Sequence, residues 1–337
     1  ATERVYDRDI GEFITRARQV PVLINYSVGN KRYPKEPDEY DLELIRKIEE
    51  SAIPYWYPTD ALPKGEKTRD PLNVGITHVH HFYTRRNLWI LACFLQKAEA
   101  SRFRMQIGFL LTSFLVKTAS KLHNIGLKKG NLNLAGALPN TLYLPSSLAE
   151  RNIPQLAERK IPDIVHVFQI PNLEHSYSLG CQSATDISLY ENSIDYIFTD
   201  PPFGGNLMYS ELNFLWEAWL KVFTNNKPEA VENKAQGKGP REYQELMEKC
   251  FAEYYRVLKP GRWMTVVFHN SQNRIWNAIQ EAIMRAGFVI ADVRTLDKKQ
   301  GTFNQAKIGY TTAVKQDLII SAYKPNGGLE KRFHLEA

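Results

Sequence analysis

Apolar and polar positions follow two different patterns along this chain, and the change falls near residue 161. Residues 87–100 and 103–124 carry apolar side chains at helical spacing, so residues 76–160 are expected to be mainly helical. Beyond residue 161, short apolar runs alternate with helical stretches, which is the signature of a doubly wound α/β sheet. Prolines interrupt residues 1–75, which are expected to be irregular apart from one strand-like run and one helix-like run.

The part beyond residue 161 predicts a particular set of elements. Short apolar runs bounded by polar residues are typical of strands, and longer runs with apolar positions three and four apart are typical of helices. Lys259-Pro260-Gly261 is expected to end one helix and to start the next strand. The expected strands are residues 177–181, 196–199, 263–269, 288–294 and 318–323, and the expected helices are residues 210–222, 243–258 and 275–286.

The composition is that of a soluble globular protein, with 43% apolar and 24% charged residues in a chain of 337. This length suggests about two domains. No apolar run approaches the roughly 18 to 20 residues of a membrane span, and no signal peptide is recognisable, so no membrane partner is expected. Cys93, Cys181 and Cys250 lie far apart, which favours a reducing cytoplasm over a disulfide framework or a cysteine-based zinc site.

Charge is concentrated in the middle of the chain. Residues 64–160 carry 15 Lys or Arg against 5 Asp or Glu, whereas the segments on either side are slightly acidic. Such a segment either lines a polyanion, with nucleic acid as the leading candidate, or forms a solvated basic surface. If nucleic acid binds, the side chains expected to meet its phosphates are Arg85, Arg86, Arg102, Arg104, Lys128 and Lys129.

Three histidines, His78, His80 and His81, follow Thr77 and suggest a metal site at first sight. Metal sites built on histidine normally add a cysteine or a carboxylate. No such partner accompanies these histidines in the sequence. A surface or packing role is therefore expected, and no metal site is predicted.

The sharpest chemical signal is Asp200-Pro201-Pro202-Phe203. It directly follows the apolar run of residues 194–199, so it lies at the carboxyl end of an expected strand, where open α/β sheets place their ligand crevice. Since Pro makes up about 5% of residues, a small polar residue followed by Pro-Pro and an aromatic residue arises by chance in about one such chain in a hundred.

These residue types suit the activation of an amine on a nucleic acid base. An exocyclic amine is a poor nucleophile because its lone pair is delocalised into the ring, and a carboxylate and a carbonyl that accept its two N–H bonds would make it more nucleophilic. Two successive prolines fix φ and bring carbonyls without competing N–H donors. An aromatic ring offers an extracted base a face for stacking. The alternative is a strand end closed by a rigid turn, with Phe203 in the core.

With its neighbours, this motif resembles the signature of amino-group methyltransferases that use S-adenosylmethionine. Members of this group act on adenine N6 or cytosine N4 in DNA, and relatives act on guanine N2 in RNA. The chain is similar in particular to bacterial adenine-specific DNA methylases, which often accompany restriction or phage-defence systems. The similarity is specific over residues 160–325 and looser over residues 75–160, and its further motifs are residues 81–88, 183–186, 192–199, 208–212, 255–261, 297–301 and 317–325.

The resemblance implies an α/β fold of the class I methyltransferase type, with S-adenosylmethionine as cofactor and DNA as partner. It implies that Asp200 and the Pro201 carbonyl hold the target amine, that Pro202 keeps the turn rigid, and that Phe203 stacks on the base. The turn after the preceding expected strand would lie against the adenine of the cofactor, or would instead be a helix N-cap. The implied cofactor-binding residues are Ser183, Ala184, Asp186 and Asp200.

Four regions are expected on this basis. Residues 1–75 form an irregular N-terminal region, residues 76–160 a basic helical insertion that binds DNA, residues 161–327 the catalytic domain, and residues 328–337 a tail. Glu211, one turn into an expected helix, either serves the crevice or complements the helix dipole.

One departure from the family pattern is the absence of a glycine-rich turn. These enzymes hold the methionine part of the cofactor with such a turn after their first strand, where the backbone approaches the ligand. Ser27-Val28-Gly29-Asn30 has one glycine, and residues 124–130 follow an expected helix. Five of the expected seven strands are found, with the first two missing, and the chain begins with Ala1. We therefore expect the C-terminal portion of a methyltransferase or one half of a split one, with the glycine motif on a missing segment or a second chain.

The leading hypothesis is transfer of a methyl group to the exocyclic amine of a flipped base, with adenine N6 as the expected target. Neither a metal nor a covalent enzyme intermediate is expected. The first alternative keeps the chemistry and changes the substrate to guanine N2 in structured RNA. The second is a non-catalytic nucleic-acid-binding subunit of a split methyltransferase.

Overall fold

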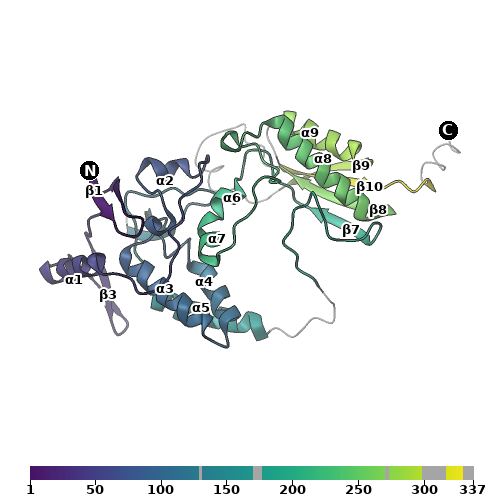
Figure 1. Cartoon of the computed structure of the whole chain (residues 1–337). Helices are drawn as coiled ribbons and strands as arrows, with labels where there is room; N and C mark the ends of the chain where they lie inside the picture. Colours follow the sequence, from purple (N-terminus) through teal and green to yellow (C-terminus); the bar gives the residue numbers. More distant parts are fainter. Residues whose placement is uncertain (129–130, 170–176, 270–272, 298–315, 329–337) are drawn as a thin grey trace. The chain divides into compact units, whose positions relative to one another are not determined.

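The computed structural model describes residues 1–128, 131–169, 177–269, 273–297 and 316–328, and in it the chain folds as two compact units (Figure 1). The first unit comprises Ala1–Ser176 and Glu211–Thr224, and the second comprises Tyr177–Ser210 and Asn225–Ala337. Each unit has its own cluster of buried apolar residues.

Two antiparallel hairpins open the first unit. They pair β1 (Thr2–Asp7) with β2 (Glu12–Ala17), and β3 (Ile24–Val28) with β4 (Lys31–Lys35). The expectation of irregular structure here was therefore wrong. Strands β1, β2 and β4 lack a regular alternation of apolar and polar residues, whereas β3 alternates and overlaps the strand-like run of residues 20–26.

The remainder of the first unit is mainly helical around its apolar core. The helix predicted over residues 87–100 is confirmed as α3, which starts where the Thr84 side chain accepts a hydrogen bond from Asn87 N. The helix expected over residues 103–124 is shorter: it ends at Phe114, residues 115–123 form turns, and residues 124–128 form a strand. The elements are α1 (Glu39–Glu50), α2 (Arg69–Asn73), the 3₁₀ helix η1 (Val79–Phe82), α3 (Arg85–Glu99), α4 (Arg104–Phe114), β5 (Asn124–Lys128), β6 (Asn131–Gly136), α5 (Ile153–Gln169) and α7 (Phe214–Leu220).

A mixed four-stranded sheet forms the centre of the second unit, and this confirms the α/β prediction. Its strands are β7 (Ile194–Thr199), β8 (Leu258–Phe268), β9 (Val289–Asp297) and β10 (Gln316–Tyr323). They lie in the order β7-β8-β10-β9, with β7 parallel to β8 and the other neighbours antiparallel. The remaining elements of this unit are α6 (Tyr209–Leu212), which begins at its boundary, the 3₁₀ helix η2 (Lys234–Gln236), α8 (Pro240–Val257) and α9 (Asn273–Arg285).

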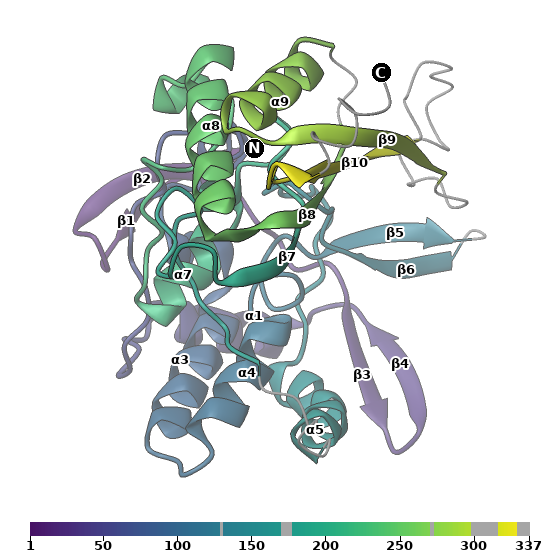
Figure 2. The same ribbon diagram turned by 90° about the vertical axis from the view of Figure 1, so that its right-hand side faces the viewer.

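Helices α8 and α9 cover one face of this sheet (Figure 2). Alternate residues of β8, including Met264 and Val266, are fully buried beneath them. On the opposite face, Tyr196, Phe198 and Trp263 are 53%, 65% and 42% exposed. The single covered face matches the period-two pattern of the strands.

Two of the predicted elements differ from the structure. Residues 177–181 form no strand, and the helix expected over residues 210–222 is interrupted at Asn213, which separates α6 from α7. Lys221, in the left-handed region with φ +57°, ends α7. Residues 298–301 of the quoted motifs lie outside the described residues. Within the described ranges, no helix combines the length and the apolar character that a membrane span needs.

Candidate functional site

Asp200-Pro201-Pro202-Phe203 forms the turn that follows β7. Because β7 and β8 are parallel, with Thr199 opposite Val266, both strands end at the same edge of the sheet. Asp200 is exposed at that edge, whereas Pro201 is buried behind it. Gly204 adopts φ +65°, a conformation that favours glycine and that turns the chain away from the sheet. The predicted position of the motif at a strand end is confirmed.

Helix α8 fixes this turn through Tyr243. This fully buried side chain donates its hydroxyl hydrogen to the Pro202 carbonyl oxygen at 2.6 Å. Burial raises the pKa of Tyr243 far above its ordinary value, so the phenol keeps its proton and remains a donor. Proline fixes φ at two successive positions, and the hydrogen bond anchors the second of them. The backbone that carries Asp200 is therefore held from two directions.

Phe203 is half-buried and packs against the core of the second unit. Its ring meets the ring of Phe268 nearly edge to face, with centroids 5.3 Å apart and planes at 89°. A second ring, that of His269, has its centroid 6.1 Å away. Aromatic pairs favour this geometry. Phe203 thus belongs to the core on one side and is still partly open to solvent.

His269 and Asp317 add an acid–base pair that the sequence analysis missed. His269 directly follows β8, and Asp317 is the second residue of the antiparallel neighbour β10, so both residues stand at the edge that carries Asp200. His269 Nδ1 lies 3.0 Å from Asp317 Oδ1, and Asp317 is buried. This separation is within ion-pair distance, and the His269 ring is half-buried.

The sequence contains a pattern from which the pairing of His269 with Asp317 could have been predicted. His269 ends one expected strand and Asp317 precedes another. Pairing those two strands would have placed both residues at one edge, but strand order cannot be derived from the pattern of apolar residues alone.

Tyr209 also lies within electrostatic reach of Asp200. Burial raises the pKa of the Tyr209 phenol, and the negative charge of Asp200 raises it further. The next residue, Ser210, is held by Glu229, which accepts hydrogen bonds from Ser210 N at 3.0 Å and from Ser210 Oγ at 2.6 Å. The edge that carries Asp200 therefore also presents a tyrosine.

The turn that contains Ser183, Ala184 and Asp186 has contacts of its own. Thr185 N donates to Ser183 Oγ at 3.2 Å, and Asp186 N donates to Ser183 O at 3.2 Å. The next residues are tied to the end of α8, because Ile187 N donates to Glu253 Oε2 at 2.9 Å. That end of α8 leads into the start of β8, so Ile187 lies at the opposite edge of the sheet from Asp200. The assignment of this turn to the cofactor stays a prediction.

Glu211 has a role in the first unit that the sequence analysis did not foresee. Its carboxylate is buried and accepts hydrogen bonds from Lys67 N at 2.6 Å and Thr68 N at 3.3 Å. A Cβ at Gly65 would lie 2.1 Å from the Glu211 carboxyl carbon, so the glycine is required for this close approach. Glu211 thus holds the loop that precedes α2.

Neither of the two glycine segments forms a turn between a strand and a helix. Gly29, with φ +58°, lies in the turn that joins β3 to β4. Gly126 lies within β5, which pairs with β6. The sequence-based conclusion that these segments are not the family's glycine motif agrees with their structure.

The basic residues proposed to contact phosphate fall into two groups. Arg85 and Arg86 are engaged within the first unit, since Arg85 Nη1 lies 2.7 Å from Asp9 Oδ2 and Arg86 Nε lies 2.9 Å from Glu150 Oε1. Arg102 and Arg104 are exposed at the start of α4. Nothing is described of the Lys128 side chain, and Lys129 lies outside the described residues.

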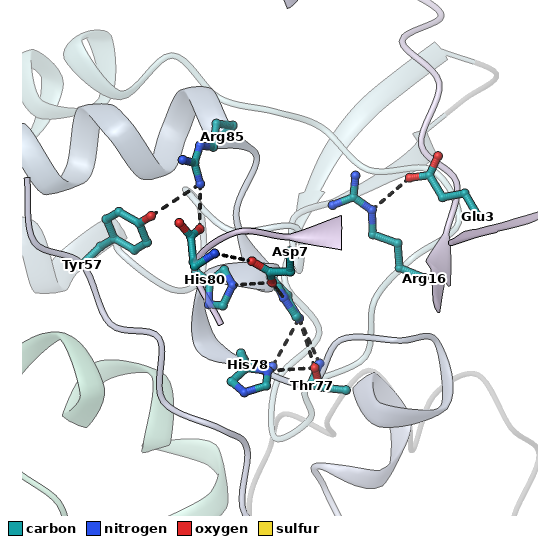
Figure 3. A network of polar contacts seen from close by, with 10 residues as sticks. Glu3, Asp7, Arg16, Tyr57, Thr77, His78, His80 and Arg85 are labelled. Carbon is teal, nitrogen blue, oxygen red and sulfur yellow. Dashed lines mark hydrogen bonds and ion pairs between the residues drawn. The ribbon is translucent and has the colours of Figure 1, made fainter. Parts of the chain in front are cut away.

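The histidine cluster has the acidic partner that the sequence analysis found missing (Figure 3). Asp7, from β1, places Oδ2 2.9 Å from His80 Nε2 and 2.6 Å from His81 Nε2. The expectation that no carboxylate accompanies these histidines was wrong, because the partner lies 73 residues away in the sequence. The three side chains offer ligand atoms within 4.8 Å of one another.

The hydrogen bonds at His81 Nδ1, the ring nitrogen that faces away from Asp7, decide whether the cluster can bind a metal ion. Its Nδ1 accepts hydrogen bonds from Thr77 N at 3.2 Å and His78 N at 3.3 Å. Backbone amides always donate, so Nδ1 carries the lone pair and Nε2 carries the proton that Asp7 accepts. A metal ion at Nε2 would have to remove that proton and leave an imidazolate. The geometry therefore favours a hydrogen-bonded clamp over a metal site.

Burial sets the charges in the clamp. It lowers the pKa of His81 to about 4, and the neighbouring His80 adds to that effect, so His81 is neutral at pH 7. Burial also lowers the pKa of His80. Burial alone would raise the pKa of Asp7, but hydrogen bonds from His81 and His80 outweigh it and hold that pKa well below its usual range. The clamp is an ionised carboxylate between two neutral imidazoles.

Comparison with known families gives a match that lies mainly in the second unit. Residues 194–334 match the family model described as DNA methylase, N6_N4_Mtase. This segment begins with β7 and contains Asp200, Phe203 and His269. The resemblance to amino-group DNA methylases is confirmed over these residues. No curated protein matches the chain.

Solved structures similar to this chain include methyltransferases. A candidate DNA modification methylase from Thermus thermophilus, crystallised with S-adenosyl-L-methionine, is 17% identical over 43% of this chain and 54% of its own, with a TM-score of 0.26. A methyltransferase from Methanosarcina mazei is 11% identical over 51% of this chain and 76% of its own, with a TM-score of 0.27. This chain thus spans about half the length of the Thermus protein. These TM-scores are too low to support a functional argument.

Proposed function

We propose that this chain is the catalytic part of a DNA methyltransferase that uses S-adenosylmethionine and methylates the N6 amine of adenine. The observation that carries the proposal is the exposed Asp200 in a rigid turn at the end of β7, inside the segment that matches the DNA methylase family. An exposed carboxylate on a fixed backbone is accessible to a substrate amine.

Asp200 and its turn supply the activation of the amine. The Asp200 carboxylate and the Pro201 carbonyl oxygen each accept one N–H bond of the target amine, which localises the nitrogen lone pair. Pro202 is held by Tyr243 and keeps these acceptors in place. Phe203 offers its open side to the extracted base, and Tyr209 borders the same space.

His269 takes up the proton that the reaction releases. When bound, S-adenosylmethionine supplies a methyl group on a positively charged sulfur. Its sulfur would keep the electron pair of the broken carbon–sulfur bond, and the target nitrogen would take the methyl group. The proton that this nitrogen gives up would pass to the His269 ring, which lies 3.0 Å from the Asp317 carboxylate.

The cofactor would be held by residues of this chain and by others. Ser183 and Asp186 offer a hydroxyl and a carboxylate, and Ala184 brings no bulk, which suits an adenosine. The family's glycine turn is absent from this sequence, so a second chain or a further segment would hold the methionine part. Arg102 and Arg104, exposed in the basic segment, would contact DNA phosphates.

A labelled methyl-transfer assay tests this function. The purified chain is incubated with tritiated S-adenosylmethionine and either duplex DNA or structured RNA, and label in the nucleic acid is counted. We expect label in DNA for the wild type and for Asp163→Ala, whose carboxylate is exposed on α5, but not for Asp200→Ala. Label in RNA alone would favour the guanine N2 alternative, and full activity of Asp200→Ala would refute the mechanism.

A further inference from the structure

Lys121 is a buried lysine without a counter-ion. It is 6% exposed, and its backbone N–H donates to Phe82 O at 2.7 Å. Across the ranges that the structure describes, its side chain has neither a hydrogen bond nor an ion pair. An ammonium in such a position normally has a partner, because its removal from water is costly. A buried ammonium of this kind suggests that a ligand binds next to Lys121.

The Lys121 side chain lines a cavity of about 270 Å³ in the first unit. The β1–β2 hairpin contributes Asp7 and Arg16 to the wall, α3 contributes Arg85, and α1 contributes Glu49. Figure 3 shows Arg16, Arg85 and Asp7 of this wall together with their partners. A cavity of this size admits a small polar group but not a drug-sized molecule.

Most charges of this wall already have partners. Asp7 is bonded to two histidines, and Asp9 forms an ion pair with Arg85. Glu49 and Glu50 are exposed on α1, where water solvates them. Glu49 and Glu150 attract the Lys121 ammonium from a distance, but among the described residues no acidic side chain forms an ion pair with it.

Arg16 makes the cavity more favourable to an anion. Arg16 and Lys121 line the same cavity. Burial lowers the pKa of Lys121 to about 8, and the positive charge of Arg16 lowers it further. At pH 7 most Lys121 side chains still carry their proton. Arg16 uses Nε in its 2.9 Å pair with Glu3, and among the described residues no other hydrogen bond or ion pair of its guanidinium group is found, so Nη1 and Nη2 can donate to a ligand. An anion between Lys121 and Arg16 would remove the repulsion and compensate the buried charge.

We propose that this cavity binds a phosphate group between the Lys121 ammonium and the Arg16 guanidinium. Phosphate is a dianion with several acceptor oxygens, so it can accept hydrogen bonds from both side chains at once. The group belongs either to a small molecule or to a nucleic acid. A metal ion is disfavoured, because His81 Nε2 carries a proton and Lys121 would repel a cation.

Calorimetric titration of inorganic phosphate into the full chain tests the proposal. Chloride keeps the ionic strength constant. We expect saturable binding by the wild type and by Lys117→Met, in which an exposed lysine nearby is replaced. Binding by Lys121→Met should be at least about tenfold weaker, the loss of one charge-assisted contact. Equal binding by Lys121→Met, or no binding by the wild type, would overturn the proposal.

Thermal unfolding separates loss of the site from loss of the fold. Without phosphate, Lys121→Met should unfold at a higher temperature than the wild type, because a buried uncompensated charge is removed. Phosphate should raise the unfolding temperature of the wild type by more than that of Lys121→Met, since phosphate also stabilises proteins without binding to a site. An equal rise in both proteins would overturn the proposal.

Competition between inorganic phosphate and two phosphate-containing ligands identifies the molecule that carries the phosphate group. Adenosine monophosphate that displaces inorganic phosphate, with no displacement by duplex DNA, would assign the site to a small molecule. Displacement by a 5′-phosphorylated duplex, but not by the same duplex without that phosphate, would assign it to a nucleic acid end. Both results support the site, and neither depends on methyl transfer.

Discussion

Asp200 and Asp7, one in each unit of the molecule, use the same functional group in opposite ways. Asp200 is exposed in a turn that a buried tyrosine anchors, so it is open to solvent at a strand end. The Asp7 side chain is 8% exposed and accepts hydrogen bonds from His80 and His81. The hydrogen bonds that the Asp7 carboxylate accepts therefore stabilise the fold. The comparison teaches that burial, more than residue type, separates a carboxylate that serves the fold from one that a substrate can reach.

The largest expected difference between the two aspartates lies in activity. Asp200→Ala should lower methyl transfer by about a thousandfold or more, because the amine loses the acceptor that makes it nucleophilic. Its free energy of unfolding should change by less than about 0.5 kcal/mol, as is usual for exposed positions. Transfer rates and urea denaturation of the same preparation measure both quantities. A large loss of unfolding free energy in Asp200→Ala would show that Asp200, like Asp7, stabilises the fold.

Asp7→Ala should have the reverse effect. It leaves two buried imidazole N–H groups without an acceptor, and the expected cost is about 3 kcal/mol of unfolding free energy. Urea denaturation measures the loss, and Asp163→Ala, at an exposed position on α5, serves as the control. A loss below about 1 kcal/mol would show that the clamp contributes little to the fold.

The clamp should also make stability depend on pH. His81 has a pKa of about 4 in the folded chain and an ordinary value of 6.5. The unfolded chain therefore binds the extra proton between these pH values, and stability is complete above pH 6.5 and falls towards pH 4. Between pH 7 and pH 5 the expected loss is about 2 kcal/mol.

Urea denaturation at a series of pH values measures this dependence. Replacing His81 with Asn should reduce the slope, because one of the two imidazoles that are kept neutral by burial is removed. His80 acts in the same direction through its own lowered pKa, so part of the slope should remain. Equal stability of the wild type at both pH values would contradict the charge states assigned to the clamp.

A smaller effect should follow from Tyr243→Phe. The variant removes the hydrogen bond to the Pro202 carbonyl and leaves the ring in place, which should cost about 1 kcal/mol of stability. Methyl transfer should fall about tenfold, because the turn that carries Asp200 is less well fixed. Tyr255→Phe on the same helix is a matched control, since its ring packs against Phe288, with centroids 5.2 Å apart. Unchanged transfer by Tyr243→Phe would mean that the prolines alone fix the turn.

The smallest expected effect is that of zinc. The clamp should not gain stability from the ion, since Nε2 of His81 keeps its proton. The unfolding temperature of the wild type should be the same with zinc chloride and with a chelator. A rise of several degrees that Asp7→Asn abolishes would contradict the assigned tautomer and would turn the clamp into a metal site.

The sequence predicted the Asp200 turn because its information is local. A strand-like run and four consecutive residues define the motif, and β7 with its parallel neighbour places it at the sheet edge as expected. The structure adds the anchor, Tyr243, which lies 41 residues away. The helical spacing of apolar residues predicts that Tyr243 is a core residue, but it does not predict the hydrogen bond of its hydroxyl.

The first unit was less predictable for a physical reason. Strands β1, β2 and β4 lack a regular alternation of apolar and polar residues, so the pattern of apolar positions did not reveal the two hairpins as such. The contact between Asp7 and the histidines depends on where the first hairpin docks. Lys121 looked like one of many basic residues in a segment of high positive charge, and only its burial sets it apart.

Mass spectrometry of nucleosides tests the central claim most directly. Duplex DNA is incubated with the chain and with S-adenosylmethionine that carries a deuterated methyl group, then digested to nucleosides. The account predicts deuterated N6-methyladenine with the wild type and none with Asp200→Ala. Deuterated methylcytosine would contradict the assigned base. The absence of any labelled nucleoside with the wild type would contradict the assignment of a methyl-transfer site to Asp200.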